Sequence, residues 1–157
     1  MSKTSIVAAI VAISTGLGLA QSAMAAAPYC EDLKQVAGHA LYAGRFSSIA
    51  GAPLDGSFVE TTLPLTGWNA CSLYGTTAYT CDSPMLPNAK AAEQAQARII
   101  DEILSCFAGS WQHILDRSSP TYAVLHPAKG AASITLSVDE TDDKQFVVRL
   151  TLFIRRG

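Results

Sequence analysis

Three histidines are the side chains best suited to acid–base chemistry, because imidazole titrates near neutral pH. They are His39, His113 and His126, and no two have the four-residue spacing with which histidines on one helix bind zinc. The sequence has no Gly-x-Ser-x-Gly motif, which would mark a serine nucleophile. The acidic run from Asp139 to Asp143 lacks the glycine and distal glutamate of a calcium loop. The sequence therefore predicts no metal and no cofactor, and any catalytic residues remain unknown.

The four cysteines can form two disulfides. No two are spaced as Cys-x-x-Cys, so neither a thioredoxin-type redox site nor a zinc knuckle is indicated. A three-residue hairpin loop at 75–77 would place Cys71 opposite Cys81 on adjacent strands. The remaining pair is then Cys30 with Cys106, which would join the start of one helix to the end of another. The alternative is four free buried thiols, which an exported protein rarely keeps.

Aromatic side chains near predicted strand ends are candidate binding residues. Trp68, Tyr74 and Trp111 lie at such places, and a cluster of them on the surface would indicate a binding face. The alternative is that their rings pack against the edge of a sheet and the end of a helix, as amphipathic aromatics often do.

The N-terminal segment has the pattern of a secretory signal peptide. Lys3 precedes an uncharged, mostly apolar run from Ile6 to Ala20, and Ala23-Met24-Ala25 provides the small residues of a cleavage site. The domain division predicted is thus 1–25 as signal peptide and 26–157 as one exported domain; the alternative is a retained anchor helix. The signal contains only Lys3 of the 11 basic residues and none of the 13 acidic ones, so the exported chain is acidic and offers no basic nucleic-acid surface.

Hydrophobic spacing predicts an α+β fold. Apolar residues at three- and four-residue intervals predict helices over 30–42 and 88–108. Alternation and β-branched content predict six strands, over 57–63, 68–74, 78–82, 121–125, 132–138 and 146–154. We expect an irregular connection over 46–56 and one further helical turn over 111–115.

These elements predict two helices packed on an antiparallel sheet, in the order α-β-β-β-α-β-β-β, stabilised by disulfides. Because both halves have the same order, a two-fold architecture is a further expectation. The predicted core consists of Leu33, Val36, Ile99, Ile103, Phe107, Ile134, Leu136, Val148, Leu150 and Leu152.

Two classes of function are compatible with these features. The favoured one is a non-enzymatic exported domain, periplasmic or secreted, that binds a protein or another envelope component or has a structural role there. In this interpretation it has no nucleic-acid partner, and the mature chain does not span a membrane. The alternative is a small exported hydrolase whose site is assembled from dispersed residues such as His39, His113 and an acid.

Overall fold

The structure is a computed structural model that describes residues 26–40 and 45–154. The predicted signal peptide, 1–25, lies outside the described residues. The described residues form two α-helices and two short 3₁₀ helices: α1 (Cys30–His39), α2 (Ala89–Cys106), η1 (Arg45–Ile49) and η2 (Leu115–Arg117). The strands are β1 (Ala50–Pro53), β2 (Phe58–Thr61), β3 (Asn69–Tyr74), β4 (Ala78–Asp82), β5 (Trp111–His113), β6 (Tyr122–Pro127), β7 (Ala132–Glu140) and β8 (Phe146–Ile154).

The strands form one antiparallel sheet in the order β1-β2-β3-β4-β8-β7-β6-β5. Each half of the chain contributes a helix followed by four strands, and the last strand of each half, β4 or β8, lies in the middle of the sheet. The α+β class and the antiparallel sheet are therefore confirmed, and the two halves share an element order as expected.

The predicted element order is wrong at two places, because β1 and β5 were missed. β1 contains Gly51 and Pro53, which disfavour a strand, but an edge strand tolerates proline. A Cβ at Gly51 would lie 3.0 Å from the Cβ of Glu60, so glycine allows β1 to approach β2 closely. In place of the helical turn expected over 111–115, Trp111 pairs with Pro127 at the other edge of the sheet. The observed order is α-β-β-β-β-α-β-β-β-β.

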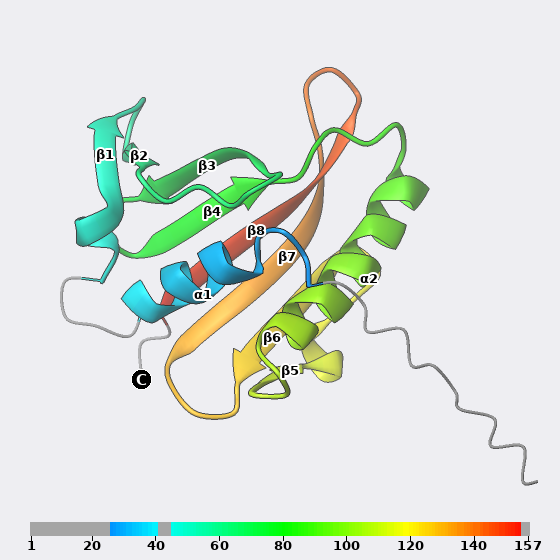
Figure 1. The fold of residues 1–157 in the computed structure, drawn as a ribbon. Helices are drawn as coiled ribbons and strands as arrows, with labels where there is room; N and C mark the ends of the chain where they lie inside the picture. Colours follow the sequence, from blue (N-terminus) through cyan, green and yellow to red (C-terminus); the bar gives the residue numbers. More distant parts are fainter. Residues whose placement is uncertain (1–25, 41–44, 155–157) are drawn as a thin grey trace, which may run out of the picture.

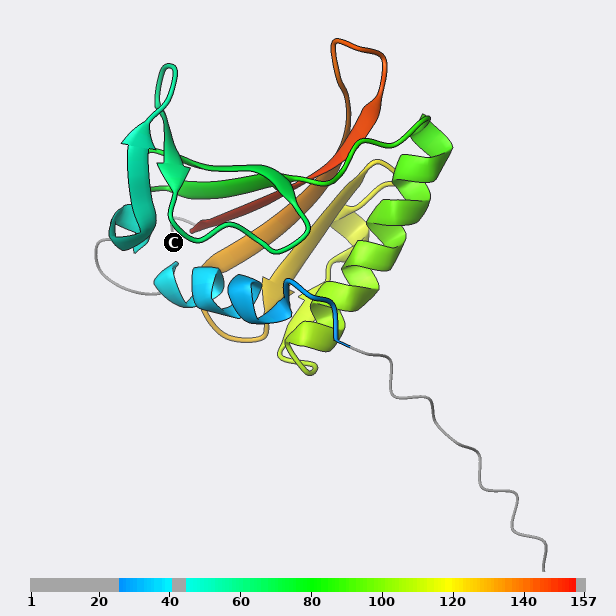
Figure 2. The same cartoon turned by 45° about the horizontal axis from the view of Figure 1, so that its top comes forward.

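Both α-helices lie on one side of the sheet (Figure 1), and a second view shows the same arrangement (Figure 2). α2 packs on β7 and β8, and α1 contacts α2 and η1. Asn88 caps α2, because its side chain accepts a hydrogen bond from the backbone N–H of Ala91. The helix ends where Ala108 and Gly109 adopt positive φ angles of 46° and 78°. No helix in the described residues is both long and apolar enough to span a membrane.

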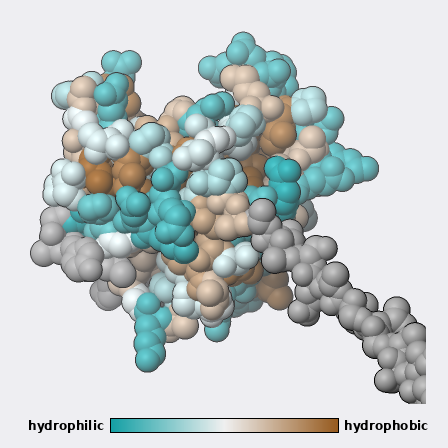
Figure 3. Space-filling view, viewed as in Figure 1, coloured by the Kyte–Doolittle hydropathy of each residue, from teal (hydrophilic) through white to brown (hydrophobic). Residues whose placement is uncertain are grey.

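A buried hydrophobic cluster fills the space between the helices and the sheet. All of the predicted core residues are buried except Phe107, which is half-buried and stacks on Trp111. On this helix side the surface in Figure 3 is mostly hydrophilic or neutral, with strongly hydrophobic colour limited to small areas. The apolar faces of the helices are thus used mainly for the core.

Both predicted disulfides are confirmed. Cys30–Cys106 joins the start of α1 to the end of α2, with the Cα atoms 5.3 Å apart. Cys71–Cys81 joins β3 to β4, with the Cα atoms 4.1 Å apart. Leu73 pairs with Tyr79 and Ser72 with Thr80, which is the register that a three-residue loop at 75–77 gives. Beyond Ser72 the register shifts, so that Ala70 and Cys71 together face Cys81. Ala70 has a φ of 44° in this bulge.

Candidate functional site

The face of the sheet that turns away from the helices, called here the outer face, is the candidate site. Side chains alternate between the two faces along each strand. On β8, for example, Leu150 and Leu152 point into the core, so Arg149, Thr151 and Phe153 point outward. Strand pairing aligns the outward side chains of neighbouring strands into rows that cross the sheet.

The first row is aromatic at its β2–β3 end. Phe58 pairs with Tyr74, and their ring centroids are 5.3 Å apart at 64°. Phe58 is 41% exposed and Tyr74 is 51% exposed, which is high for such large side chains. The row continues with Ala78 on β4 and Phe153 on β8. Because the side chain of Ala78 is small, the surface is lower there than at the aromatic positions on either side.

The second row consists of hydroxyl side chains. Ser72, Thr80, Thr151 and Thr135 are consecutive Cα partners on β3, β4, β8 and β7. Adjacent strands lie about 4.7–4.9 Å apart, so the hydroxyl groups repeat at that interval across the sheet. The Oγ1 atoms of Thr80 and Thr151 are 3.5 Å apart. Each hydroxyl can both donate and accept a hydrogen bond, and together they form a neutral polar stripe.

The third row contains the ion pair of Asp82 and Arg149, with the carboxylate of Asp139 beside it. Nε and Nη2 of Arg149 donate to the two carboxylate oxygens of Asp82 at 2.7 Å and 3.1 Å. Nη1 of Arg149 also lies 3.0 Å from Asp139 Oδ2. The hydrogen bond with Asp82 is the main cause of the raised pKa of Arg149. The two carboxylates hold the guanidinium in a fixed orientation and offset its charge.

The three rows enclose a shallow groove of about 530 Å³. Its lining includes the Phe58–Tyr74 pair, the hydroxyls of the second row on β3, β4 and β8, and the Asp82–Arg149 pair. A smaller hollow of about 260 Å³ lies beside it, lined by Phe153, Thr135 and residues of β6. The two are neighbours because Ala78 pairs with Phe153 and Thr151 pairs with Thr135. The outer face can thus accommodate an extended ligand that needs stacking and hydrogen bonds.

The structure does not bring the three predicted binding aromatics together. Tyr74 lies in the groove, whereas Trp68 is half-buried on the helix side, with its ring 5.6 Å from that of Tyr29. Trp111 is only 7% exposed and stacks on Phe107 at 4.8 Å. Sequence reasoning missed Phe58, whose position beside Tyr74 depends on how β2 pairs with β3.

The histidines of the hydrolase alternative lie on different elements and each contacts its own serine. His39, at the end of α1, has Nδ1 2.9 Å from the hydroxyl of Ser48. His113, in β5, has Nε2 3.0 Å from the hydroxyl of Ser118. The Ser118 hydroxyl already donates to the carbonyl of Ile114 and accepts from a backbone N–H, so His113 must donate to it. This pair therefore locks a turn and does not present an activated nucleophile.

No carboxylate contacts His39 or His113 within 26–40 and 45–154. In the same ranges, no group of three or more histidine, cysteine or acidic side chains could hold a metal ion.

Two phenols have raised pKa values. Burial raises the pKa of Tyr29, whose hydroxyl also donates to Glu102 at 2.6 Å. Burial likewise raises the pKa of Tyr79, which donates to the carbonyl of Leu63. Both phenols are held neutral on the helix side and have structural partners.

Comparisons with models of protein families, with curated proteins and with solved structures find no match to this chain.

Proposed function

We propose that the protein is an exported, non-catalytic binding domain, and that its outer face binds an uncharged glycan of the cell envelope. The observation that supports this proposal is the set of three parallel rows on a sheet face that neither described α-helix covers. An exposed aromatic pair, a hydroxyl stripe and an oriented Asp–Arg pair line one groove.

Each row matches a different part of a sugar chain. The apolar face of a pyranose ring stacks on an aromatic ring such as Tyr74 or Phe58, which explains why such large side chains are left exposed. Sugar hydroxyls exchange hydrogen bonds with Ser and Thr hydroxyls and with planar, fixed groups such as the Asp82–Arg149 pair. Because two carboxylates offset Arg149, the groove favours a neutral ligand over a strongly anionic polymer.

The envelope location is also a proposal, and two observations support it. Two disulfides are typical of proteins that fold in an oxidising compartment outside the cytoplasm. The pattern of Lys3, the apolar run and Ala23-Met24-Ala25 predicts export. We propose that the protein acts in the periplasm or after secretion, where envelope glycans are accessible.

Co-sedimentation with insoluble glycans tests the proposed function. The exported protein is mixed with chitin, which is built from neutral sugars, and with protein-free murein sacculi, and the pelleted fraction is measured over a range of concentrations. We expect saturable binding that Tyr74→Ala and Phe58→Ala each weaken about tenfold, since removing one well-packed aromatic from an interface often costs more than about 1 kcal/mol. Met85→Ala removes an exposed side chain that does not line the groove and should bind normally.

Two outcomes would overturn the proposal. One is that neither glycan pellets the protein. The other is that an envelope protein is bound instead and is lost with Tyr74→Ala, because the outer face would then be a protein interface.

The alternative, a small exported hydrolase, has one observation in its favour, which is the 2.9 Å contact between His39 and the exposed Ser48. Hydrolysis of p-nitrophenyl acetate by the purified protein tests it. Turnover that Ser48→Ala abolishes would support the alternative, and turnover no faster than that of the Ser48→Ala variant would refute it.

A further inference from the structure

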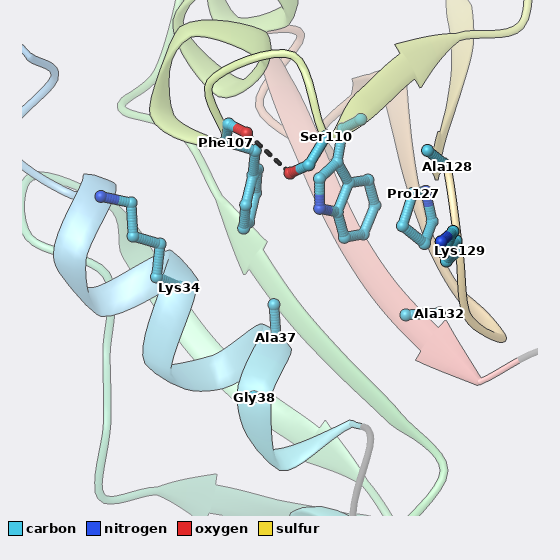
Figure 4. A pocket seen from close by; sticks show the side chains of 10 residues that line it. Lys34, Ala37, Gly38, Phe107, Ser110, Pro127, Ala128, Lys129 and Ala132 are labelled. Atoms are coloured by element: carbon cyan, nitrogen blue, oxygen red, sulfur yellow. Dashed lines mark hydrogen bonds between the residues drawn. The ribbon is translucent and has the colours of Figure 1, made fainter.

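A second cleft lies on the helix side of the sheet, away from the outer face. It has a volume of about 430 Å³ and is bounded by α1, by the end of α2 and by the chain between β6 and β7 (Figure 4). This cleft is separate from the groove proposed to bind glycan, because the two share no lining residue.

The walls of the cleft are apolar and its floor is built from small residues. Phe107 and Trp111, stacked on each other, form one side. Ala37, Gly38 and Ala132 occupy positions where larger side chains would fill the space. A Cβ added at Gly38 would meet no atom within 4 Å, so the space beside α1 is open.

The polar side chains around the cleft supply donors and positive charge. Lys34 and Lys129 line it from α1 and from the β6–β7 connection, Ser110 adds a hydroxyl, and none of the described residues that line it is acidic. Lys34 pairs with Glu31, which is 77% exposed, and such exposed pairs contribute little and exchange readily. Lys129 forms no ion pair with the residues that the structure describes.

Trp111 provides a second and independent observation. Its side chain is nine-tenths buried, yet the indole N–H finds no acceptor among residues 26–40 and 45–154. No fully buried side-chain nitrogen or oxygen in those residues lacks a partner. The indole N–H is therefore not fully buried, and because Trp111 lines the cleft, it is available to donate to a ligand there.

We propose that this cleft binds an amphiphilic carboxylate, with its apolar body against Phe107 and Trp111 and its carboxylate at the rim beside Lys129. The apolar walls bind the hydrocarbon part by burial. The positive charge of the lysines favours a carboxylate at the rim and disfavours a cationic head group. The inference does not depend on the proposed glycan function, because it concerns a different face of the molecule.

Tryptophan fluorescence tests the proposal directly. The chain has two tryptophans, so a Trp68→Phe background leaves Trp111 as the only indole. In that background the protein is titrated with decanoate below its micelle concentration, with neutral decan-1-ol and with cationic decyltrimethylammonium. We expect a saturable change in Trp111 fluorescence with decanoate and no saturable change with the cation. The affinity for decan-1-ol should be about fivefold lower than that for decanoate, because a partly exposed ion pair adds only modestly to affinity.

Two variants locate the ligand. Lys129→Gln, in an exposed connection, should reduce the preference for decanoate over decan-1-ol to less than about twofold. Gly38→Leu fills the cleft and should weaken both ligands by at least about tenfold. Lys90→Gln, a matched exposed lysine outside the cleft, should bind as the parent protein does.

The proposal is overturned if all three amphiphiles bind equally, if none binds saturably, or if Lys129→Gln leaves the preference unchanged. It is also overturned if the protein is a dimer that Gly38→Leu dissociates, because a second copy of the chain would then occupy the cleft. Loss of glycan binding in the outer-face variants would leave all of these outcomes unaffected, so the two proposals can fail separately.

Discussion

The two faces of the same strands differ in what they contribute. On β8, Val148, Leu150 and Leu152 are completely buried under the helices, whereas Arg149 and Thr151 between them line the groove. Burying a large aliphatic side chain stabilises a fold by about 1.5–3 kcal/mol, while a hydroxyl on a solvated face contributes little. The inner face therefore determines stability, and the outer face is free to carry recognition. One-residue alternation is enough to separate these two roles.

The largest expected effect concerns the disulfide that joins the two helices over the inner face. Removing Cys30–Cys106 with Cys106→Ser should lower the free energy of unfolding by about 4.5 kcal/mol in the chain-entropy model, because it closes a long loop. Its sequence separation is 76 residues, against 10 for Cys71–Cys81. Cys71→Ser should cost about 3 kcal/mol by the same reasoning. Urea unfolding under non-reducing conditions measures both, and a larger loss for Cys71→Ser would contradict this ranking.

A matched pair on one strand tests the comparison of the faces directly. Leu150→Ala should destabilise the protein by about 2–5 kcal/mol, since it leaves a cavity in the core. Thr151→Ala, one residue further on, should change stability by less than about 1 kcal/mol. Urea midpoints at constant m value provide the measurement. Equal losses would show that the outer face is also part of the stabilising core.

The ionisable groups of the two sides also differ. Burial raises the pKa of Tyr29 and of Tyr79 on the helix side, so the folded protein keeps these phenols protonated above their ordinary value of about 10. Their contribution to stability is complete below about pH 10 and is lost as the pH rises further, because the unfolded chain then ionises first.

Tyr29→Phe and Tyr79→Phe should therefore each flatten the loss of stability between about pH 10 and pH 11 relative to the wild type. Brief thermal melts across that range provide the test. The slope is compared and not the absolute stability, because each change also removes a hydrogen bond. A slope that neither variant alters would mean that other groups cause the alkaline loss.

The smallest expected effect is stabilising. Gly38 lies in α1 with a φ outside the left-handed region, and a Cβ there meets no atom. Gly38→Ala should raise the free energy of unfolding by about 0.4–1 kcal/mol, because it restricts the unfolded chain. Thermal denaturation detects this change, and a lower melting temperature would show that glycine is needed at this position.

Local patterns in the sequence predicted the parts of the fold that depend on neighbouring residues. The loop at 75–77 set the register of β3 with β4 and led to both disulfide pairs. Strict alternation identified β7 and β8 almost to their ends. β1 and β5 were missed because they are short edge strands that owe their structure to the partner strand beside them.

Less of the candidate site was predictable, because exposure is a property of the packed molecule. Tyr74 and Trp111 have the same kind of sequence context, yet one is half-exposed in the groove and the other is buried. Phe58 joins Tyr74 only through the pairing of β2 with β3, and the irregular connection between those strands leaves their register open. The rows of the outer face likewise require the register of four strands at once.

Side-chain NMR during a titration with soluble chitin oligosaccharides tests the central claim most directly, because it distinguishes the two faces of one strand. The account predicts saturable shifts of the aromatic signals of Phe58 and Tyr74 and of the Thr80 and Thr151 methyl groups. The methyl groups of Leu150 and Leu152, which point into the core, should shift far less. Shifts confined to the helix side, or no saturable shift on the outer face, would contradict the account.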